Sequence, residues 1–262
     1  MGDWNTFAGQ YFKEWRPDLH VCRPFVPSSR NLIVGGLDWG RKDPFAFYLA
    51  EVFRVDFDGV KFYRSKVFME VYGTEKNPEE WAKIIKEKIK GYGIKLSDIS
   101  WIRADTQIWQ KGLDNKALDI YTQFVQAQDE FRFLKPANKD RIGGWSNLHQ
   151  WLSIAPDGIP YLQVSSECIN FIETFPTMIH DENKIEDVDT DSPDHAGDAV
   201  RYLHMGLKWI DAKVGAINSQ PKGDKIRKMT AQFIGEKQVG INLGAWETPN
   251  KLNNGVGAVI RR

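Results

Sequence analysis

Few features of this sequence point to a membrane, a disulfide framework or a nucleotide-binding loop. Among its 262 residues are only two cysteines, Cys22 and Cys168, too far apart for a metal-binding or redox motif. This cysteine usage is typical of a reducing cytoplasm. No apolar run approaches the roughly 18–20 residues of a membrane span, and the N-terminus has no signal-peptide pattern. The phosphate-binding pattern Gly-x-x-x-x-Gly-Lys-Ser/Thr is also missing. These absences argue against a membrane protein, a disulfide-stabilised secreted domain and a P-loop nucleotidase.

The net charge is zero, but the charge is unevenly distributed. Residues 213–262 hold nine Lys/Arg and three Asp/Glu, a net charge of +6, so residues 1–212 carry a net charge of −6. The body is rich in aromatic residues, with ten Trp and fifteen Phe to fill a core. We therefore expect an acidic globular body followed by a basic extension.

Patterns of apolar residues predict an α/β protein. Three strand patterns come first, and Asp58-Gly59 between the second and third is typical of a hairpin turn. Helix and strand patterns alternate after them. This order predicts a mixed five-stranded sheet, an antiparallel meander plus parallel strands, with helices on both faces. The predicted strands are 31–40, 44–57, 60–72, 100–105 and 131–136, with 161–165 as a candidate short strand; the predicted helices are 77–93, 113–128, 142–152, 166–175 and 192–210. Asn77 is the predicted cap of the first of these helices, and 181–194 is expected to be an acidic loop before the last.

Three aspartates stand where apolar residues are expected. Asp38 interrupts the first strand pattern, Asp105 ends the fourth, and Asp198 lies on the packed side of a helix that Ser192 and Pro193 are predicted to begin. The opposite side of this helix, which carries Arg201 and His204, is expected to be solvated. Considered alone, each aspartate has a simpler explanation. Asp38 could be a turn residue, Asp105 a cap of the next segment, and Asp198 a member of an ion pair or a cap of a neighbouring loop. A right-handed crossover would bring the fourth strand beside the first, about 4.8 Å away. The three carboxylates could then meet.

A cluster of carboxylates suits a hard divalent cation. Carboxylate oxygens are preferred ligands of Mg²⁺ and Mn²⁺, and Mg²⁺ keeps positions open for water and phosphate. Two such ions about 3.5–4 Å apart stabilise the attacking and leaving oxygens in phosphoryl transfer. Without metal, the carboxylates would raise one another's pKa values. The aspartates together therefore favour a metal-dependent reaction at phosphate.

Several short motifs resemble one protein family. GDWNTFAGQYFKEWRPDLHV, GLDWGRKDPFAF, IRADTQ and DHAGDAVRYL occur in this order, and the sequence resembles the C-terminal nuclease domain of the large terminase subunit of tailed bacteriophages from about Gly2 to Trp209. The resemblance implies an RNase H-like fold, cutting of DNA with Mg²⁺ or Mn²⁺ (two ions), and an ATPase domain preceding this one in the full protein. The pair Thr106-Gln107 departs from the family pattern, where a small or proline-containing pair is expected.

The resemblance assigns roles to single residues. It implies that Asp38, Asp105 and Asp198 are both catalytic residues and metal ligands. The remaining assignments are His195 as an auxiliary group that orients a ligand, Asp43 as an accessory acid or a turn residue before proline, Asp194 as a further ligand or a helix-dipole partner, and Lys139 and Arg141 as DNA contacts or residues of a solvated loop.

The implied function is endonucleolytic cutting of concatemeric viral DNA, with low sequence specificity, when packaging begins and ends. The implied partners are double-stranded DNA, the portal protein of the procapsid, the small terminase subunit and the ATPase domain, with no membrane. The implied location is the host cytoplasm, transiently the portal vertex, and not the mature virion. Two alternatives stay open: another RNase H-like nuclease, such as a junction resolvase or transposase, and a non-catalytic docking module of a packaging motor.

Three segments are expected along the chain: a linker or arm over 1–24, a nuclease domain over 25–212 and a basic extension over 213–262. The extension has four glycines in GINLGAWETPNKLNNGVGAVI and ends in Arg261-Arg262. Its composition suits a loosely packed segment that either holds DNA or docks on an acidic surface of the portal or capsid.

Deletion of 213–262 distinguishes the two roles of the extension. We expect plasmid cleavage to survive largely intact and packaging into portal-bearing capsids to fail, because GAVIRR combines apolar anchors with charge as a docking peptide does. Both activities are measured on the same preparation. Loss of cleavage with packaging retained would place the extension on DNA instead.

Overall fold

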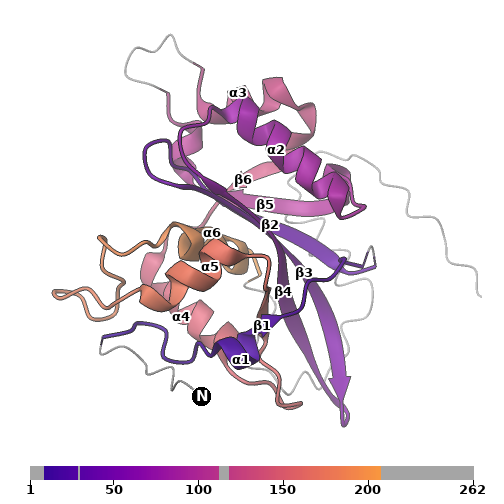
Figure 1. Cartoon of the computed structure of the whole chain (residues 1–262), viewed down its shortest axis with the longest axis vertical. Coiled ribbons are helices and arrows are strands. Elements are labelled where there is room, and N and C mark those ends of the chain that lie inside the picture. The colour runs from indigo at the N-terminus through magenta and orange to yellow at the C-terminus, as the bar shows by residue number, and fades with distance from the viewer. Residues whose placement is uncertain (1–8, 29, 112–117, 208–262) are drawn as a thin grey trace, which may run out of the picture. The chain divides into compact units, whose positions relative to one another are not determined.

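A seven-stranded mixed sheet is the centre of the computed structural model, which describes residues 9–28, 30–111 and 118–207 (Figure 1). The central antiparallel meander and the parallel strands beside it follow the prediction, so the fold class is confirmed. The strand count of five was too low. Two short strands extend the sheet beyond the meander. Leu162–Ser165 confirms the candidate short strand at 161–165, whereas Val21–Cys22 has only two residues, too few to show any alternation. Across the sheet the order is β1 (Val21–Cys22), β7 (Leu162–Ser165), β4 (Val60–Gly73), β3 (Phe45–Phe57), β2 (Leu32–Asp38), β5 (Ile99–Ala104) and β6 (Leu134–Pro136).

Helices cover both faces of the sheet (Figure 1). On one face lie α2 (Pro78–Gly91) and α3 (Ile120–Ala127), and on the other α4 (Arg141–Leu152), α5 (Ile169–Thr174) and α6 (His195–Met205). Each face has its own hydrophobic core, and β2 contributes to both because its side chains alternate. The shorter helices are α1 (Pro17–His20), η1 (Leu96–Asp98), η2 (Thr106–Trp109), η3 (Asp129–Phe133) and η4 (Phe175–Thr177).

The N-terminal segment packs on the core formed by α4, α5 and α6. Phe12 and Trp15 are buried, and the Phe12 ring stacks on Phe175 with ring centroids 4.4 Å apart. Farther along, β1 pairs in parallel with β7. Residues 9–22, which were expected to form part of a linker or arm, therefore add side chains to the core and a strand to the sheet. The basic extension predicted over 213–262 lies outside the described residues.

Helix α6 differs from its predicted form in two ways. It begins at His195 with Asp194 as its N-cap residue, each two residues later than predicted, and Pro193 lies in the loop that precedes the helix. Arg201 and His204, assigned to a solvated side, are also buried. Arg201 forms an ion pair with Asp198, and the His204 ring hydrogen-bonds to the hydroxyl of Ser65. Polar side chains can be buried here because each has a partner.

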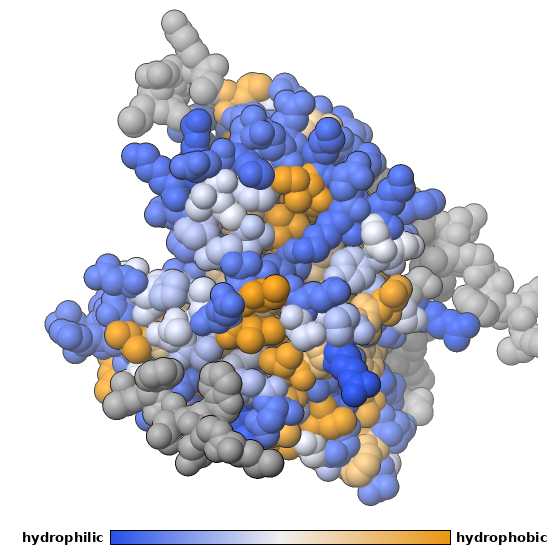
Figure 2. All heavy atoms as spheres, viewed as in Figure 1, coloured by the Kyte–Doolittle hydropathy of each residue, from blue (hydrophilic) through white to orange (hydrophobic). Residues whose placement is uncertain are grey.

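Exposed surfaces are mostly polar. On the face seen in Figure 2, hydrophilic residues predominate over α2 and α3, and exposed apolar residues form separate groups. Among the described residues, no helix is long and apolar enough to cross a membrane.

Helix α6 lies directly on β2. A Cβ atom placed on Gly36 would lie 1.8 Å from the carbonyl oxygen of Ala199, a backbone atom that cannot turn away. At its other end, α6 meets β5, where a Cβ on Gly206 would lie 2.3 Å from the ring of Trp101. Glycine at these two positions therefore sets how closely the helix approaches the sheet.

Replacing Gly36 with alanine is expected to lower the free energy of unfolding by at least about 2 kcal/mol, since the helix must move away from the strand. Gly91→Ala is the matched control, because a Cβ there meets nothing within 4 Å; it is expected to be neutral or to stabilise by up to about 1 kcal/mol. Urea denaturation of both variants measures the difference. Equal stabilities would show that α6 does not constrain β2.

Candidate active site

Strand alternation places Asp38 and Asp105 on the face that α6 covers. Along β2, Val34 belongs to the core under α6, and residue 38 has the same parity as residue 34. Along β5, Trp101 packs in that same core, and Asp105 shares its parity. The two strands are parallel, Leu37 pairs with Ala104, and the backbone N–H of Asp105 donates to the carbonyl of Leu37 at 2.9 Å. The two aspartates therefore end neighbouring strands side by side.

Asp198 reaches the same place from the first turn of α6. It lies one residue before Ala199, the residue that contacts Gly36 of β2. In the same first turn of α6, His195 hydrogen-bonds to Asp38, so this turn of the helix lies at the end of β2. The convergence predicted for the ends of β2 and β5 and the last helix is thus present in the fold; the catalytic and metal-binding roles stay predictions.

His195 contacts Asp38. The ring nitrogen Nδ1 donates to Asp38 Oδ2 at 2.9 Å, and this hydrogen bond is the main cause that raises the pKa of His195. The pKa of Asp38 is also raised: burial is the largest cause, His195 opposes it, and Asp105 and Asp194 add to it. Asp43 is exposed in the loop between β2 and β3, and its charge also raises the pKa of His195.

Asp105 has two partners, of which the sequence predicted only the cap of the next segment. Its Oδ1 accepts the backbone N–H of Gln107 at 2.9 Å and so caps η2, which is the simpler of the two predicted roles. The same oxygen lies 3.3 Å from Nζ of Lys139, which is about half exposed. The carboxylate is therefore held by a local cap and by a cation from the segment that joins β6 to α4.

Two arginines share Asp198. Arg201 Nε donates to Oδ1 at 2.9 Å, and Arg141 Nη1 donates to Oδ2 at 3.4 Å. The Arg201 guanidinium is buried between the rings of Trp145 and Tyr202, 4.7 and 4.6 Å from their centroids. Burial nevertheless raises the pKa of Asp198 to about 6, with contributions from Asp194 and Asp38, although Arg201 lowers it. Keeping this carboxylate ionised in the folded protein is thus costly.

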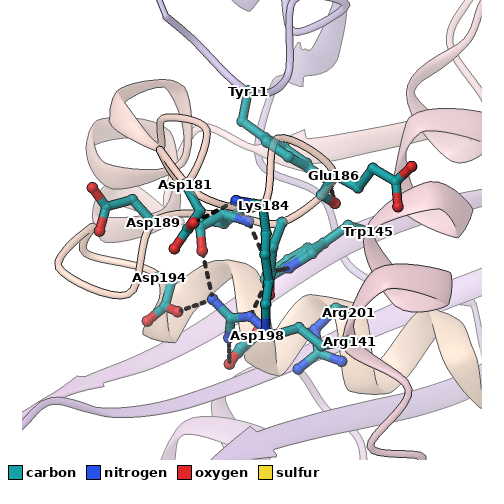
Figure 3. Close-up of polar contacts among 12 residues, drawn as sticks. Tyr11, Arg141, Trp145, Asp181, Lys184, Glu186, Asp189, Asp194, Asp198 and Arg201 are labelled. Atoms are coloured by element: carbon teal, nitrogen blue, oxygen red, sulfur yellow. Dashed lines mark hydrogen bonds and ion pairs between the residues drawn. The ribbon is translucent and has the colours of Figure 1, made fainter.

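Arg141 lies at the centre of an acidic group (Figure 3). It donates to Asp187 at 2.8 Å and to Asp194 at 2.9 Å, in addition to Asp198. Burial opposes its positive charge, but the three carboxylates together raise its pKa. Arg141 and Lys139 were predicted to contact DNA or to lie in a solvated loop; both are paired with acids of this site. Asp194, predicted as a ligand or a dipole partner, is the N-cap residue of α6 and a partner of Arg141.

Two residues of this group were not assigned to the site from the sequence. Arg201 was placed on a solvated side, although its position three residues after Asp198 predicts a pair on one helix face. Asp187 was expected only as part of an acidic loop over 181–194, yet it accepts from both Arg141 and the Trp145 indole. No local sequence signal links Asp187 to Trp145 and Arg141, which lie 42 and 46 positions earlier, because these contacts form only in the tertiary structure.

The donor chemistry of the three aspartates fits Mg²⁺ or Mn²⁺, since all three are carboxylates: Asp38 and Asp105 lie at the ends of two parallel strands, and Asp198 lies in the first turn of α6. Among the described residues, however, no group of three or more His, Cys, Asp or Glu is arranged to hold a metal ion. A cationic or histidine side chain faces each carboxylate instead: His195 at Asp38, Lys139 at Asp105, and Arg141 and Arg201 at Asp198.

Solved structures with similar folds are large terminases. The nuclease domain of the P22 large terminase is 18% identical with a TM-score of 0.56, over 79% of this chain and 97% of that one. The large terminase of a thermophilic bacteriophage, solved in complex with ADP, is 16% identical with a TM-score of 0.56, over 76% of this chain and 45% of that one. The large terminase nuclease of thermophilic phage G20c, solved with bound cobalt, is 11% identical with a TM-score of 0.47.

These similarities show that the chain has the RNase H-like fold of large terminase nuclease domains, as the sequence resemblance implied. The chain spans less than half the length of the ADP-bound large terminase that it matches. No protein-family model matches the sequence, and neither does a curated protein.

The raised pKa of Asp198 predicts that Asp198→Asn stabilises the metal-free protein. In the unfolded chain the carboxyl ionises near 3.8, and in the folded protein near 6, so folding favours its protonated form. The free-energy cost of ionising Asp198 in the folded protein is absent below pH 3.8 and complete above pH 6. We expect the variant to gain about 2 kcal/mol in EDTA at about pH 8, and the gain to shrink as the pH falls through about 6 towards about 4.

Urea denaturation across this pH range measures the gain. Asp56→Asn removes an exposed carboxylate on the β3–β4 hairpin and is the control. A loss of stability in Asp198→Asn at the alkaline end of the range would mean that the ion pairs with Arg141 and Arg201 outweigh burial.

Proposed function

We propose that this chain is the nuclease domain of a phage large terminase subunit and cuts DNA in a reaction that needs Mg²⁺ or Mn²⁺. The observation that carries the proposal is the placement of Asp38 and Asp105 side by side at the ends of β2 and β5, with Asp198 of α6 over them. The shared fold with the P22 nuclease domain supports it. In this proposal the chain cuts concatemeric viral DNA when genome packaging begins and ends.

Asp38, Asp105 and Asp198 would hold the metal ions, which we propose to be two. When bound, such ions supply an activated water and neutralise the leaving oxygen of the phosphodiester. His195 holds Oδ2 of Asp38, so it fixes the orientation of that carboxylate. Arg201, buried between two rings, fixes Oδ1 of Asp198 in the same way.

The substrate in this proposal is double-stranded DNA, cut with low sequence specificity, because nothing in the sequence resembles a base-reading helix or a zinc finger. Lys139 is about half exposed beside Asp105, where a phosphate of the backbone would approach. The ATPase domain, the small terminase subunit and the portal protein of the procapsid are the proposed partners. The proposed location is the host cytoplasm, and transiently the portal vertex.

Replacing the aspartates one at a time tests the proposal. With Mn²⁺, the chain is expected to nick and linearise a plasmid, and EDTA should stop it. Asp38→Asn, Asp105→Asn and Asp198→Asn should each lower the rate at least about 100-fold, because each removes charge where the metal ions bind. Asp56→Asn, which removes an exposed carboxylate distant in sequence from all three, should retain the rate.

Calorimetry with Mn²⁺ separates catalysis from a docking role. Heat of binding that disappears in Asp38→Asn and remains in Asp56→Asn supports a metal site. Wild-type rates in all three active-site variants would overturn the assignment of the site. Much faster cutting of a four-way junction than of linear duplex DNA would favour a resolvase instead.

A further inference from the structure

One short segment supplies two of the cations that pair with the candidate metal ligands. The segment 137–141 joins β6 to α4, and it begins beside Asp105, since the N–H of Ala137 donates to the carbonyl of Ala104 at 2.8 Å. Its turn is held locally: Asp140 Oδ1 accepts the N–H of Gly143 and caps α4. The backbone is therefore ordered around the two side chains that reach the acids.

Arg141 is held more firmly by the acidic loop than by Asp198. Its contacts with Asp187 and Asp194 are 2.8 and 2.9 Å long, whereas its contact with Asp198 is 3.4 Å. Asp187 itself is fixed, because its Oδ1 also accepts the indole N–H of Trp145 at 3.1 Å and the N–H of Val188 at 2.8 Å. The guanidinium can therefore stay on the loop while its contact with Asp198 breaks.

The two oxygens of Asp198 differ in how their partners can move. Oδ1 is bound by Arg201, whose side chain is only 3% exposed and is enclosed by Trp145 and Tyr202. Oδ2 is bound by Arg141, whose side chain is 26% exposed. Oδ1 is consequently fixed for structural reasons, and Oδ2 is the oxygen that a ligand from solvent can take over.

The acidic loop is anchored from the N-terminal segment. Tyr11 donates its hydroxyl to the carbonyl of Glu186 at 2.6 Å, one residue before Asp187 (Figure 3). The Tyr11 ring also lies against the His180 ring, with centroids 4.7 Å apart. Tyr11 lies outside the site itself, so it affects Asp198 only through the loop and Arg141.

We propose that Arg141, held by Asp187 and Asp194, is a built-in counter-cation that covers Oδ2 of Asp198 and competes with a divalent metal ion for it. The inference rests on the proposed function, because it assumes that Asp198 is a metal ligand. It accounts for the arrangement of the site: three carboxylates stand together, and the chain's own cations neutralise them. With a metal ion on Oδ2, Arg141 would lose its contact with Asp198 and keep those with Asp187 and Asp194.

The binding of Mn²⁺ by the 262-residue chain, measured by calorimetry without DNA, tests the competition. Arg141→Gln removes the competing charge, so it should bind Mn²⁺ about tenfold or more tightly than the wild type, as expected for losing a cation a few ångströms from the ligand. Lys135→Gln is the control, because it removes an equal charge from the exposed part of β6. It should leave the affinity within about twofold, since exposed charges are screened.

Two further variants make each outcome decisive. Tyr11→Phe keeps the ring and loses only the hydroxyl that anchors the loop, so it should tighten Mn²⁺ binding less than Arg141→Gln does. Arg141→Lys keeps the charge with a shorter reach and should give an affinity between those of wild type and Arg141→Gln, which keeps the test available if Arg141→Gln fails to fold.

The outcomes separate this proposal from the proposed function. Tighter binding in Arg141→Gln, lost when Asp198→Asn is added, supports the counter-cation. Equal or weaker binding in both Arg141 variants, with wild-type binding abolished by Asp198→Asn alone, overturns the counter-cation and leaves the nuclease proposal standing. Absence of Mn²⁺ binding in the wild type and in every variant overturns both.

Discussion

The contact between Gly36 and the carbonyl of Ala199 is the constraint on which the rest of the site depends. It lets α6 lie on β2 without a side chain between them. Because Asp38 follows two residues after Gly36, and Asp198 precedes Ala199, the contact also sets how near the two carboxylates stand. The parallel pairing of β2 with β5 then brings in Asp105. Three acids from distant parts of the chain meet because one helix approaches one strand closely.

This arrangement makes the site costly to fold. Burial raises the pKa values of Asp38 and Asp198; Asp105 and Asp194 add to the effect at Asp38, and Asp194 and Asp38 add to it at Asp198. The protein offsets the cost with side chains of its own, among which Arg201 is buried and Arg141 is partly exposed. Perturbed pKa values of this kind are common at sites that bind a ligand or carry out a reaction. The partly exposed cation is accordingly the one that a ligand can displace.

The N-terminal segment, residues 9–15, contacts both the core beneath α5 and the acidic loop over 181–194. Phe12 and Trp15 fill the core beneath α5, and Tyr11 reaches the acidic loop that holds Arg141. A chain of contacts therefore runs from residues 9–15 to Asp198.

The sequence alone predicted the fold class, most of the helices and strands, and the position of the three aspartates in them. Alternation, the hairpin at Asp58-Gly59 and the cap at Asn77 depend on neighbouring residues, and the structure retains the meander, α2 and the pairing of β2 with β5. The tertiary structure alone decided the partners of the acids. Arg141 meets Asp187, Asp194 and Asp198 across 46 to 57 positions. No local pattern encodes such contacts, and the solvated side assigned to α6 was wrong because α4 covers it.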